Sequence, residues 1–311
     1  MRSTTLLGLG AGLAGMAGAR SGIMEILDGW KDSPYARYPT DFTRGITPKG
    51  IHSHNDYWRD VPLRTAIANG AISVEADVWL FNETLYIGHD TSSLTENRTF
   101  ENLYINPLVD ILTKQNPTSC FAHTKTRNTT SGVFDTSISQ TLFLFVDLKT
   151  SGKETWPAVV KALAPLRALD YLASIQDDVL IPGPVTVIGT GSTPLDAIRP
   201  LSTRDYFFDG VLRTLDSQNI TKVISPVASA QLSSTVGKVG HEGLNATQRG
   251  MVKRQVEEAH KKGIFVRYWD LPGWPVSLRN RVWRDLVGAG VDLLNVDDLE
   301  AGAGVAVSVE W

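Results

Sequence analysis

The sequence predicts an α/β fold, a single (β/α)8 TIM barrel, and three observations support this prediction. The chain has 311 residues, which suits one barrel of about 250 residues with extensions. Its second half repeats units of an apolar strand segment and an amphipathic helix. The continuous apolar run Leu142–Val146 is typical of a parallel strand buried on both faces. We expect the barrel to occupy residues 50–311, after an N-terminal extension at residues 20–49.

The first 19 residues have the pattern of a signal peptide. A basic start is followed by the apolar run Leu6–Met16 and the small triplet Ala17–Ala19, and the run is too short and too rich in glycine to span a membrane. We therefore expect a signal peptide at residues 1–19, a secreted protein and no transmembrane segment. The absence of acidic residues before Glu25 fits a mitochondrial protein as the alternative. Five Asn-x-Thr sequences are potential N-glycosylation sites, at Asn82, Asn97, Asn128, Asn219 and Asn245, and glycans are expected on at least one of Asn82, Asn97 or Asn219.

The first half of the predicted barrel begins with a strand at Gly50–His54. A short helix that Gly70 ends leads into a second strand at Ser73–Trp79, and this strand-helix-strand order predicts parallel pairing. A turn then leads into a third strand at Leu85–Gly88. The Ser/Thr-rich segment Thr124–Ser137 is expected to be disordered.

The second half continues the alternation of strands and helices. Tyr206–Leu212 and Val223–Ala228 both have the pattern of a strand, and the pattern does not decide which is the sixth barrel strand. The remaining expected elements are a helix at Glu154–Leu169, a strand at Val185–Ile188, a helix at Thr247–Lys262, a strand at Ile264–Trp269, a helix at Ser277–Ala289 and a strand at Val291–Val296.

Polar side chains gather where these strands end. Glu75 and Asp77 alternate with apolar residues, so both carboxylates point to one face of their strand, either toward a cation or simply toward water. Barrel enzymes place their chemistry at the carboxyl ends of the strands. Five further polar residues lie at or near such ends, namely His52, His54, His89, Asp147 and Lys149.

Three short motifs carry a resemblance to a known family. They are Ser53–Tyr57, Val74–Trp79 and Gly88–Asp90, in this order and spacing. Together they resemble the phospholipase C-like phosphodiesterase superfamily. Within it, the stretch is most similar to the fungal altered inheritance of mitochondria protein 6 family.

The resemblance implies a role for each site residue. A divalent cation, Mg²⁺ or Ca²⁺, would suit the oxygen ligands that the resemblance implies. The implied acid and base are His54 and His89, the implied phosphate contact is Lys149, the implied metal ligands are Glu75, Asp77, Asp147 and Asn55, and the expected substrate contacts are Trp269, His52 and Arg59.

The resemblance also implies a function. It is metal-dependent cleavage of a lysophospholipid, a glycerophosphodiester or an inositol-lipid-like substrate, through a cyclic phosphate where the substrate has a neighbouring hydroxyl. The partner would be a small phosphodiester or a lipid, with a transient contact to a membrane surface. A formal net charge of −3 provides no broad basic surface, so nucleic acid is not expected as a partner. The sequence does not indicate an oligomeric state.

Two alternatives remain at this stage. His52 and His54 form the H-x-H with which metal-dependent amidohydrolases begin, and Asp297 could be their last-strand aspartate, but Val185–Gly191 and Tyr206–Ala228 lack the histidines that this class needs. The second alternative is a secreted barrel without catalysis that binds lipid, carbohydrate or protein.

Overall fold

The structure, a computed structural model, describes residues 21–36, 38, 42–119 and 130–306. The chain divides into an N-terminal unit, Met1–Pro39, and a barrel unit, Thr40–Trp311. The barrel unit begins before the predicted boundary at residue 50, because the buried Thr43 hydroxyl donates a hydrogen bond to the Val133 carbonyl. The predicted signal peptide and the predicted glycosylation site at Asn128 lie outside the described residues.

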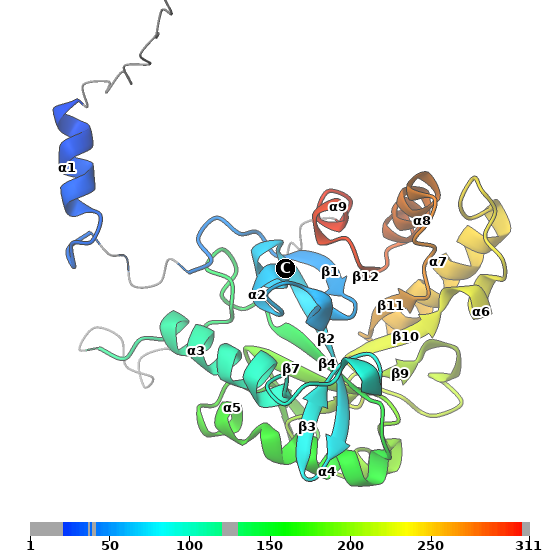
Figure 1. Cartoon of the computed structure of the whole chain (residues 1–311). Helices are drawn as coiled ribbons and strands as arrows, with labels where there is room; N and C mark the ends of the chain where they lie inside the picture. The colour runs from blue at the N-terminus through cyan, green and yellow to red at the C-terminus, as the bar shows by residue number, and fades with distance from the viewer. Residues whose placement is uncertain (1–20, 37, 39–41, 120–129, 307–311) are drawn as a thin grey trace, which may run out of the picture. The chain divides into compact units, whose positions relative to one another are not determined.

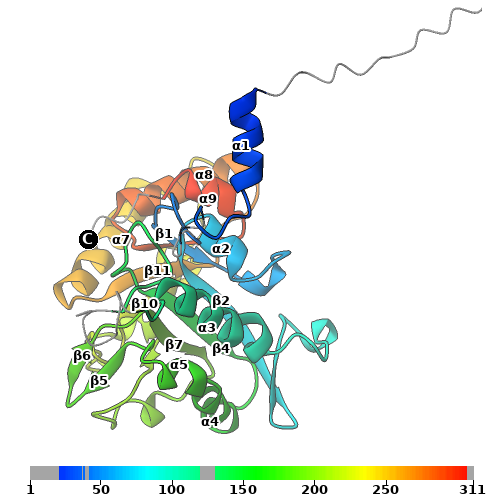
Figure 2. The same ribbon diagram turned by 90° about the vertical axis from the view of Figure 1, so that its left-hand side faces the viewer.

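A parallel sheet closes into the barrel (Figures 1 and 2). Its strands are β1 (Lys49–Ser53), β2 (Ala71–Phe81), β4 (Leu142–Leu148), β7 (Val185–Gly191), β8 (Phe207–Phe208), β9 (Gly210–Val211), β10 (Val227–Gln231), β11 (Phe265–Trp269) and β12 (Leu293–Val296). They follow one another in the order β8-β7-β4-β2-β1-β12-β11-β10-β9. Strands β8 and β9 are two halves of one segment, interrupted at Asp209; β8 pairs with β7 and β9 pairs with β10. This segment closes the ring and confirms the predicted (β/α)8 fold.

Two strand predictions change in the structure. The segment predicted as a third strand forms β3 (Thr84–Ile87), which pairs antiparallel with β2 as a hairpin outside the ring. Because a two-residue turn joins β2 to β3, no helix is available to carry the chain back for parallel pairing. Both candidates for the sixth strand are used, since β8 with β9 provides the fifth position and β10 the sixth.

Helices surround the ring of strands (Figures 1 and 2). Helix α7 illustrates their construction: Asn245 and Gln248 form a capping box at its start, and Val252, Val256 and Ala259 form its buried face. No helix among the described residues is both long and apolar enough to cross a membrane. The helices of the barrel unit are α2 (Arg64–Ala68), α3 (Asn106–Gln115), α4 (Gly152–Ala162), α5 (Ala164–Ala168), α6 (Leu232–Val236), α7 (Ala246–Lys261), α8 (Val276–Gly288) and α9 (Leu299–Ala303), with short turns at Asp56–Trp58, Thr91–Ser93, Glu101–Ile105, Leu195–Ala197 and Leu212–Thr214.

The core extends beyond the ring into a connection that the sequence suggested was disordered. Val133 and Phe134 are fully buried, so the expectation of disorder is wrong for this part of Thr124–Ser137. Residues 124–129 lie outside the described residues. The two remaining strands, β5 (Ser174–Gln176) and β6 (Val179–Ile181), form a separate antiparallel hairpin.

A buried carboxylate holds the loop between β1 and α2. Asp56 accepts hydrogen bonds from Leu63 N at 2.6 Å, from Ser53 Oγ at 2.8 Å and from Tyr104 Oη at 3.2 Å. The first of these bonds also holds Leu63 in a strained conformation with a positive φ of 63°. Burial raises the pKa of Asp56 to about 6, so the group is ionised at pH 8.

We expect Asp56→Ala to lower the free energy of unfolding by about 3 kcal/mol, because it leaves two buried donors, Leu63 N and Ser53 Oγ, unpaired, while Tyr104 Oη keeps the Glu75 carbonyl as an acceptor. Urea denaturation at pH 8 measures this loss. The exposed neighbour Asp60 provides the matched control, Asp60→Ala, which should lose almost nothing. Equal losses in the two variants would contradict the assignment of Asp56 as the residue that holds this loop.

Candidate active site

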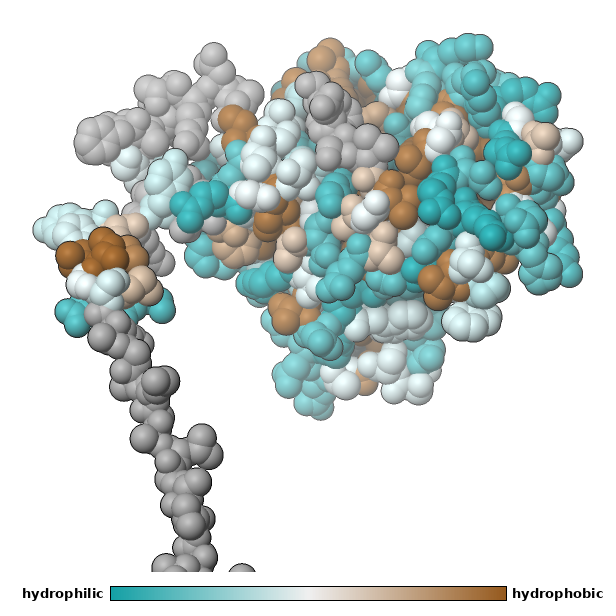
Figure 3. Space-filling model, turned by 90° about the horizontal axis from the view of Figure 1, so that it is seen from above, coloured by the Kyte–Doolittle hydropathy of each residue, from teal (hydrophilic) through white to brown (hydrophobic). Residues whose placement is uncertain are grey.

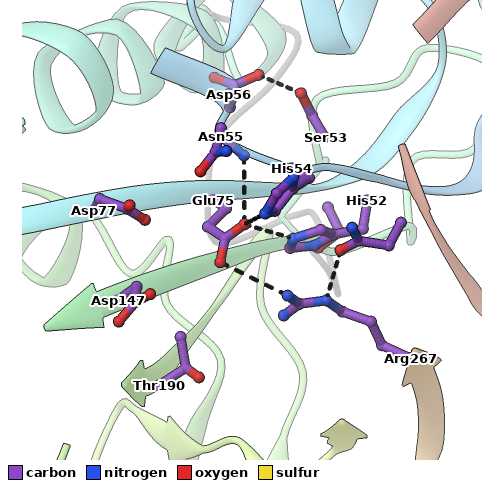
Figure 4. Close-up of polar contacts among 12 residues, drawn as sticks. His52, Ser53, His54, Asn55, Asp56, Glu75, Asp77, Asp147, Thr190 and Arg267 are labelled. Atoms are coloured by element: carbon purple, nitrogen blue, oxygen red, sulfur yellow. Dashed lines mark hydrogen bonds and ion pairs between the residues drawn. The ribbon is translucent and has the colours of Figure 1, made fainter. Parts of the chain in front are cut away.

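Three carboxylates converge inside the barrel near the carboxyl ends of β2 and β4. The strand register places Asp77 directly beside Asp147, and Glu75 lies two residues earlier on the same face of β2. One carboxylate oxygen from each of these three residues lies within 4.8 Å of the others. Figure 4 shows the three side chains turned toward the same space. This arrangement is a candidate site for a cation.

The surroundings of Asp77 fit such an ion. This side chain is 1% exposed, and its Oδ1 has no hydrogen-bond partner among the described residues. Burial and the charge of Glu75 raise the pKa of Asp77 to about 6, although Lys149 opposes this shift. Lys149 Nζ lies 2.9 Å from Asp77 Oδ2 and 2.6 Å from Asp147 Oδ2. The donor set is therefore all oxygen, with one buried oxygen unpaired, which suits a hard divalent cation.

A glycine makes room for the third carboxylate. Gly191 ends β7 with φ of +62°, and a Cβ at this position would lie 1.9 Å from Asp147 Oδ1. Any other residue would push Asp147 away from Asp77. The close approach therefore depends on glycine for space as well as for its backbone conformation.

Two histidines flank the carboxylates. His54 follows β1, and its Nε2 lies 3.8 Å from Glu75 Oε2. His89 follows β3; its Nδ1 lies 3.7 Å from Asp77 Oδ2 and 3.4 Å from the Tyr57 hydroxyl. Both imidazoles are partly exposed, with 32% and 52% of their side-chain surface accessible. The site thus offers one solvent-accessible imidazole beside each carboxylate of β2.

Asp297 orients His54. The register of β1 and β12 pairs Ser53 with Val296, so the next residues of the two strands are neighbours, and His54 Nδ1 lies 2.8 Å from Asp297 Oδ1. Burial alone would lower the pKa of His54, but the hydrogen bond to Asp297 and the charges of Glu75 and Asp297 outweigh burial and raise it. The N-cap of the following helix α9 is the next residue, Asp298.

We expect Asp297→Asn to lower the pKa of His54, because an amide does not stabilise the imidazolium as a carboxylate does. NMR titration of the histidine Cε1–H signals measures this: the His54 signal should change at lower pH than in the wild type. Below the lowered pKa, His54 is protonated in both the variant and the wild type. The two titration curves therefore differ only at higher pH. Asp298→Asn is the matched control, since Asp298 pairs with Arg279 at 2.9 Å. An unchanged His54 titration in Asp297→Asn would contradict this role.

Three polar residues on different sides of Glu75 hold its carboxylate (Figure 4). Arg267 Nη2 lies 3.6 Å from Glu75 Oε1, while His52 Nε2 and the Asn55 backbone N lie 3.3 Å and 3.4 Å from Oε2. Burial would raise the pKa of Glu75, yet the Arg267 charge and the His52 hydrogen bond outweigh it and keep the pKa below its ordinary value. Glu75 is therefore ionised and fixed in orientation.

One expected substrate contact, His52, is corrected by the structure, and a second, Arg59, supports neighbouring strands. His52 is 0% exposed; burial and the Arg267 charge lower its pKa to about 3, and its Nδ1 bonds to Ser73 Oγ at 2.7 Å. It is a neutral support for Glu75, because no surface remains for a substrate. Arg59 donates to the carbonyls of Asp297, His54 and Val296, so its guanidinium ties β1 to β12.

The other expected residues are placed as follows. Asn55 is buried in a left-handed conformation, and its Oδ1 lies 2.7 Å from the Tyr57 hydroxyl, which is also 2.7 Å from Asp77 Oδ2. Trp269 ends β11 with 40% of its surface exposed. His52 and His54 both reach Glu75 Oε2 with their Nε2 atoms, at 3.3 Å and 3.8 Å, whereas their Nδ1 atoms bond to different residues, Ser73 and Asp297.

Two residues of the site were missed in the sequence. Arg267 was detectable as a lone charge within the apolar strand Ile264–Trp269, and a buried charge needs a partner. Tyr57 belongs to the first motif but had no assigned role, although its hydroxyl lies between Asn55, Asp77 and His89. Nothing in its spacing indicates that contact.

Comparison with known proteins identifies related chains. Residues 40–209 match the family model of the AIM6-like phosphodiesterase domain. The altered inheritance of mitochondria protein 6 homolog of Arthroderma benhamiae is 49% identical over 306 residues, which cover 95% of this chain and 96% of the relative. The altered inheritance of mitochondria protein 6 of Saccharomyces cerevisiae is 32% identical, over 86% of this chain and 72% of the relative.

Solved structures also match. A glycerophosphodiester phosphodiesterase from Agrobacterium tumefaciens is 13% identical with a TM-score of 0.41, over 83% of this chain and 98% of the other. A glycerophosphoryl diester phosphodiesterase from Parabacteroides distasonis is 12% identical with a TM-score of 0.44, over 86% of this chain and 89% of the other.

The expectation of secretion is corrected by these relatives. Their shared name refers to the inheritance of mitochondria, which points away from a secreted protein. A basic start without acidic residues is compatible with both a secretory signal and a mitochondrial presequence, so this feature does not distinguish the two destinations. By the matched domain and the extent of identity, the chain belongs to the altered inheritance of mitochondria protein 6 family, whose domain is phosphodiesterase-like.

Proposed function

We propose that the chain cleaves a phosphodiester with the help of one hard divalent cation, Mg²⁺ or Ca²⁺. The observation that carries this proposal is the cluster of three carboxylates within 4.8 Å, flanked by one histidine beside each of Glu75 and Asp77. Phosphodiester cleavage needs two proton transfers and a means of stabilising negative charge on phosphorus. The two histidines would transfer the protons, and the three carboxylates would hold the cation that stabilises the charge.

Glu75, Asp77 and Asp147 would hold the cation, with Asn55 as a further oxygen ligand. When bound, the cation would stabilise the negative charge that develops on the phosphate oxygens. Lys149, which already lies between Asp77 and Asp147, would contact the same phosphate as a second positive charge.

His54 and His89 would transfer the protons. Asp297 holds Nδ1 of His54, so Nε2 is the nitrogen left to exchange a proton with substrate. The Nδ1 of His89 faces Asp77 and Tyr57, which likewise leaves its Nε2 for substrate. One imidazole takes the proton of the attacking hydroxyl or water, and the other gives a proton to the leaving oxygen.

The substrate class follows from the nucleophile. Lysophospholipids, glycerophosphodiesters and inositol lipids carry a hydroxyl beside the phosphate, and an intramolecular attack avoids the entropy of recruiting water. A cyclic phosphate is then the first product. Trp269, exposed at the end of β11, would contact the substrate.

Phosphorus NMR of a diester panel tests this function. The panel contains lysophosphatidylcholine, glycerophosphocholine and phosphatidylinositol, each with metal-stripped protein and with added Mg²⁺ or Ca²⁺. We expect turnover of at least one diester that depends on the metal, with a cyclic intermediate where a neighbouring hydroxyl is present. Absence of turnover with both metals, or equal turnover after stripping, would contradict the proposal.

A further inference from the structure

The N-terminal unit contains a helix with no buried residue, α1 (Gly22–Trp30). Five of its nine residues are large and apolar, and each is about half exposed: Ile23 59%, Met24 48%, Ile26 58%, Leu27 56% and Trp30 53%. Figure 3 shows apolar residues, in brown, grouped on the surface of this helix. Exposed apolar residues concentrated in this way mark a binding surface rather than a solvated one.

The apolar side chains of α1 share one broad face. At about 100° per residue, Ile26, Trp30, Ile23, Leu27 and Met24 cover an arc of about 160°, with Glu25 and Asp28 on the opposite side. A helix that docks in a protein groove uses anchors at i, i+3, i+4 and i+7, which are the positions of Ile23, Ile26, Leu27 and Trp30. Met24 lies outside this row and widens the apolar face, as in helices that lie flat on a bilayer.

Aromatic residues and charge balance point to the same kind of surface. Tyr35 and Tyr38, shortly after Trp30, are 88% and 59% exposed, and Trp and Tyr favour the level of the lipid head groups. Residues 20–38 carry three basic and three acidic side chains, so no net charge would attract anionic lipid. Binding would therefore come from apolar burial alone. A second copy of a nine-residue helix would bury too little surface for a stable dimer.

We propose that α1 binds the surface of a neutral lipid bilayer and tethers the barrel to it. Ile23, Leu27 and Trp30 insert among the lipid chains at the head-group boundary, and Glu25 and Asp28 stay in water. The inference does not depend on the proposed phosphodiesterase activity, because it concerns a different unit of the chain. If the substrate is a lipid, the tether also raises its effective concentration at the barrel.

Flotation of the full-length chain with phosphatidylcholine vesicles tests the tether. The double variant Ile23→Ser/Leu27→Ser should bind more weakly, by on the order of tenfold for each side chain. The matched control Glu25→Gln/Asp28→Asn changes the polar face of the same helix and should float like the wild type. Raising the salt concentration or adding phosphatidylserine should leave wild-type binding unchanged.

The depth of Trp30 in the bilayer tests whether α1 is the segment that inserts. Lipids brominated on their acyl chains should quench part of the tryptophan fluorescence of the wild type, and Trp30→Phe should lose that part. Wild-type flotation that Ile23→Ser/Leu27→Ser retains would overturn the proposal, since another segment would then be binding. Wild-type protein that does not float, including protein that self-associates through α1 instead, would also overturn it. Turnover is not part of either readout, so failure here leaves the phosphodiesterase proposal untouched.

Discussion

His54→Ala should lower the rate of phosphodiester cleavage by a factor of about 10² to 10⁴, and His89→Ala by a similar factor, because each variant removes one proton transfer. Initial rates at saturating metal concentration measure both losses. Neither imidazole belongs to the carboxylate cluster, so the affinity for the cation should stay close to that of the wild type. A large loss of rate with unchanged metal binding separates proton transfer from damage to the metal site.

The leaving group distinguishes the two histidines. A diester with a nitrophenolate leaving group needs little protonation, so the variant that lacks the general acid should recover most of its rate on this substrate. The variant that lacks the general base should not recover. His260→Ala is the matched control, since His260 lies on the surface of α7 and pairs with Asp292 at 2.8 Å. Wild-type rates in both His54→Ala and His89→Ala would exclude paired-histidine catalysis.

Much of the carboxylate cluster was visible in the sequence. Alternation along β2 places Glu75 and Asp77 on one face whatever the rest of the fold does, and Asp147 follows an apolar run that is typical of a buried strand. The depth of a side chain inside the barrel was not visible. His52 and His54 are two residues apart and are expected on the same face of their strand. His52 is nevertheless fully buried beside Glu75, whereas His54 is partly exposed to solvent. Layers in a barrel depend on strand tilt and shear, which no local pattern encodes.

Contacts between distant strands were also beyond the sequence. Arg267 meets Glu75, and Asp297 meets His54, only because β11, β12, β1 and β2 lie side by side in register. The fifth barrel position was hard to read for a local reason: Asp209 divides it into two-residue strands, too short for a periodic pattern. The alternation of strands and helices, in contrast, followed from their periodicity, although periodicity did not separate the hairpin strand β3 from the barrel strands.

Asp77→Asn should weaken binding of Mg²⁺ or Ca²⁺ by about 100-fold or more, because it removes one of the three charged ligands without changing the shape of the side chain. Asp77 is the best ligand to replace, because its Oδ1 is buried and unpaired among the described residues. Glu75 also contacts Arg267 and His52, so its replacement would disturb more than the metal site. Calorimetric titration of metal-stripped protein measures the affinity. Asp90→Asn is the matched control, since Asp90 is an exposed carboxylate that caps the turn at Thr91–Ser93.

Lys149→Met should act in the opposite direction on the same titration. Lys149 Nζ lies 2.9 Å from Asp77 and 2.6 Å from Asp147, so it is a positive charge that competes with the cation for both carboxylates. Removing it should leave metal affinity equal or higher, while turnover falls because the phosphate loses a cationic contact. Unchanged affinity in Asp77→Asn, or a loss of affinity in Lys149→Met as large as in Asp77→Asn, would contradict a cation held by Asp77 and Asp147.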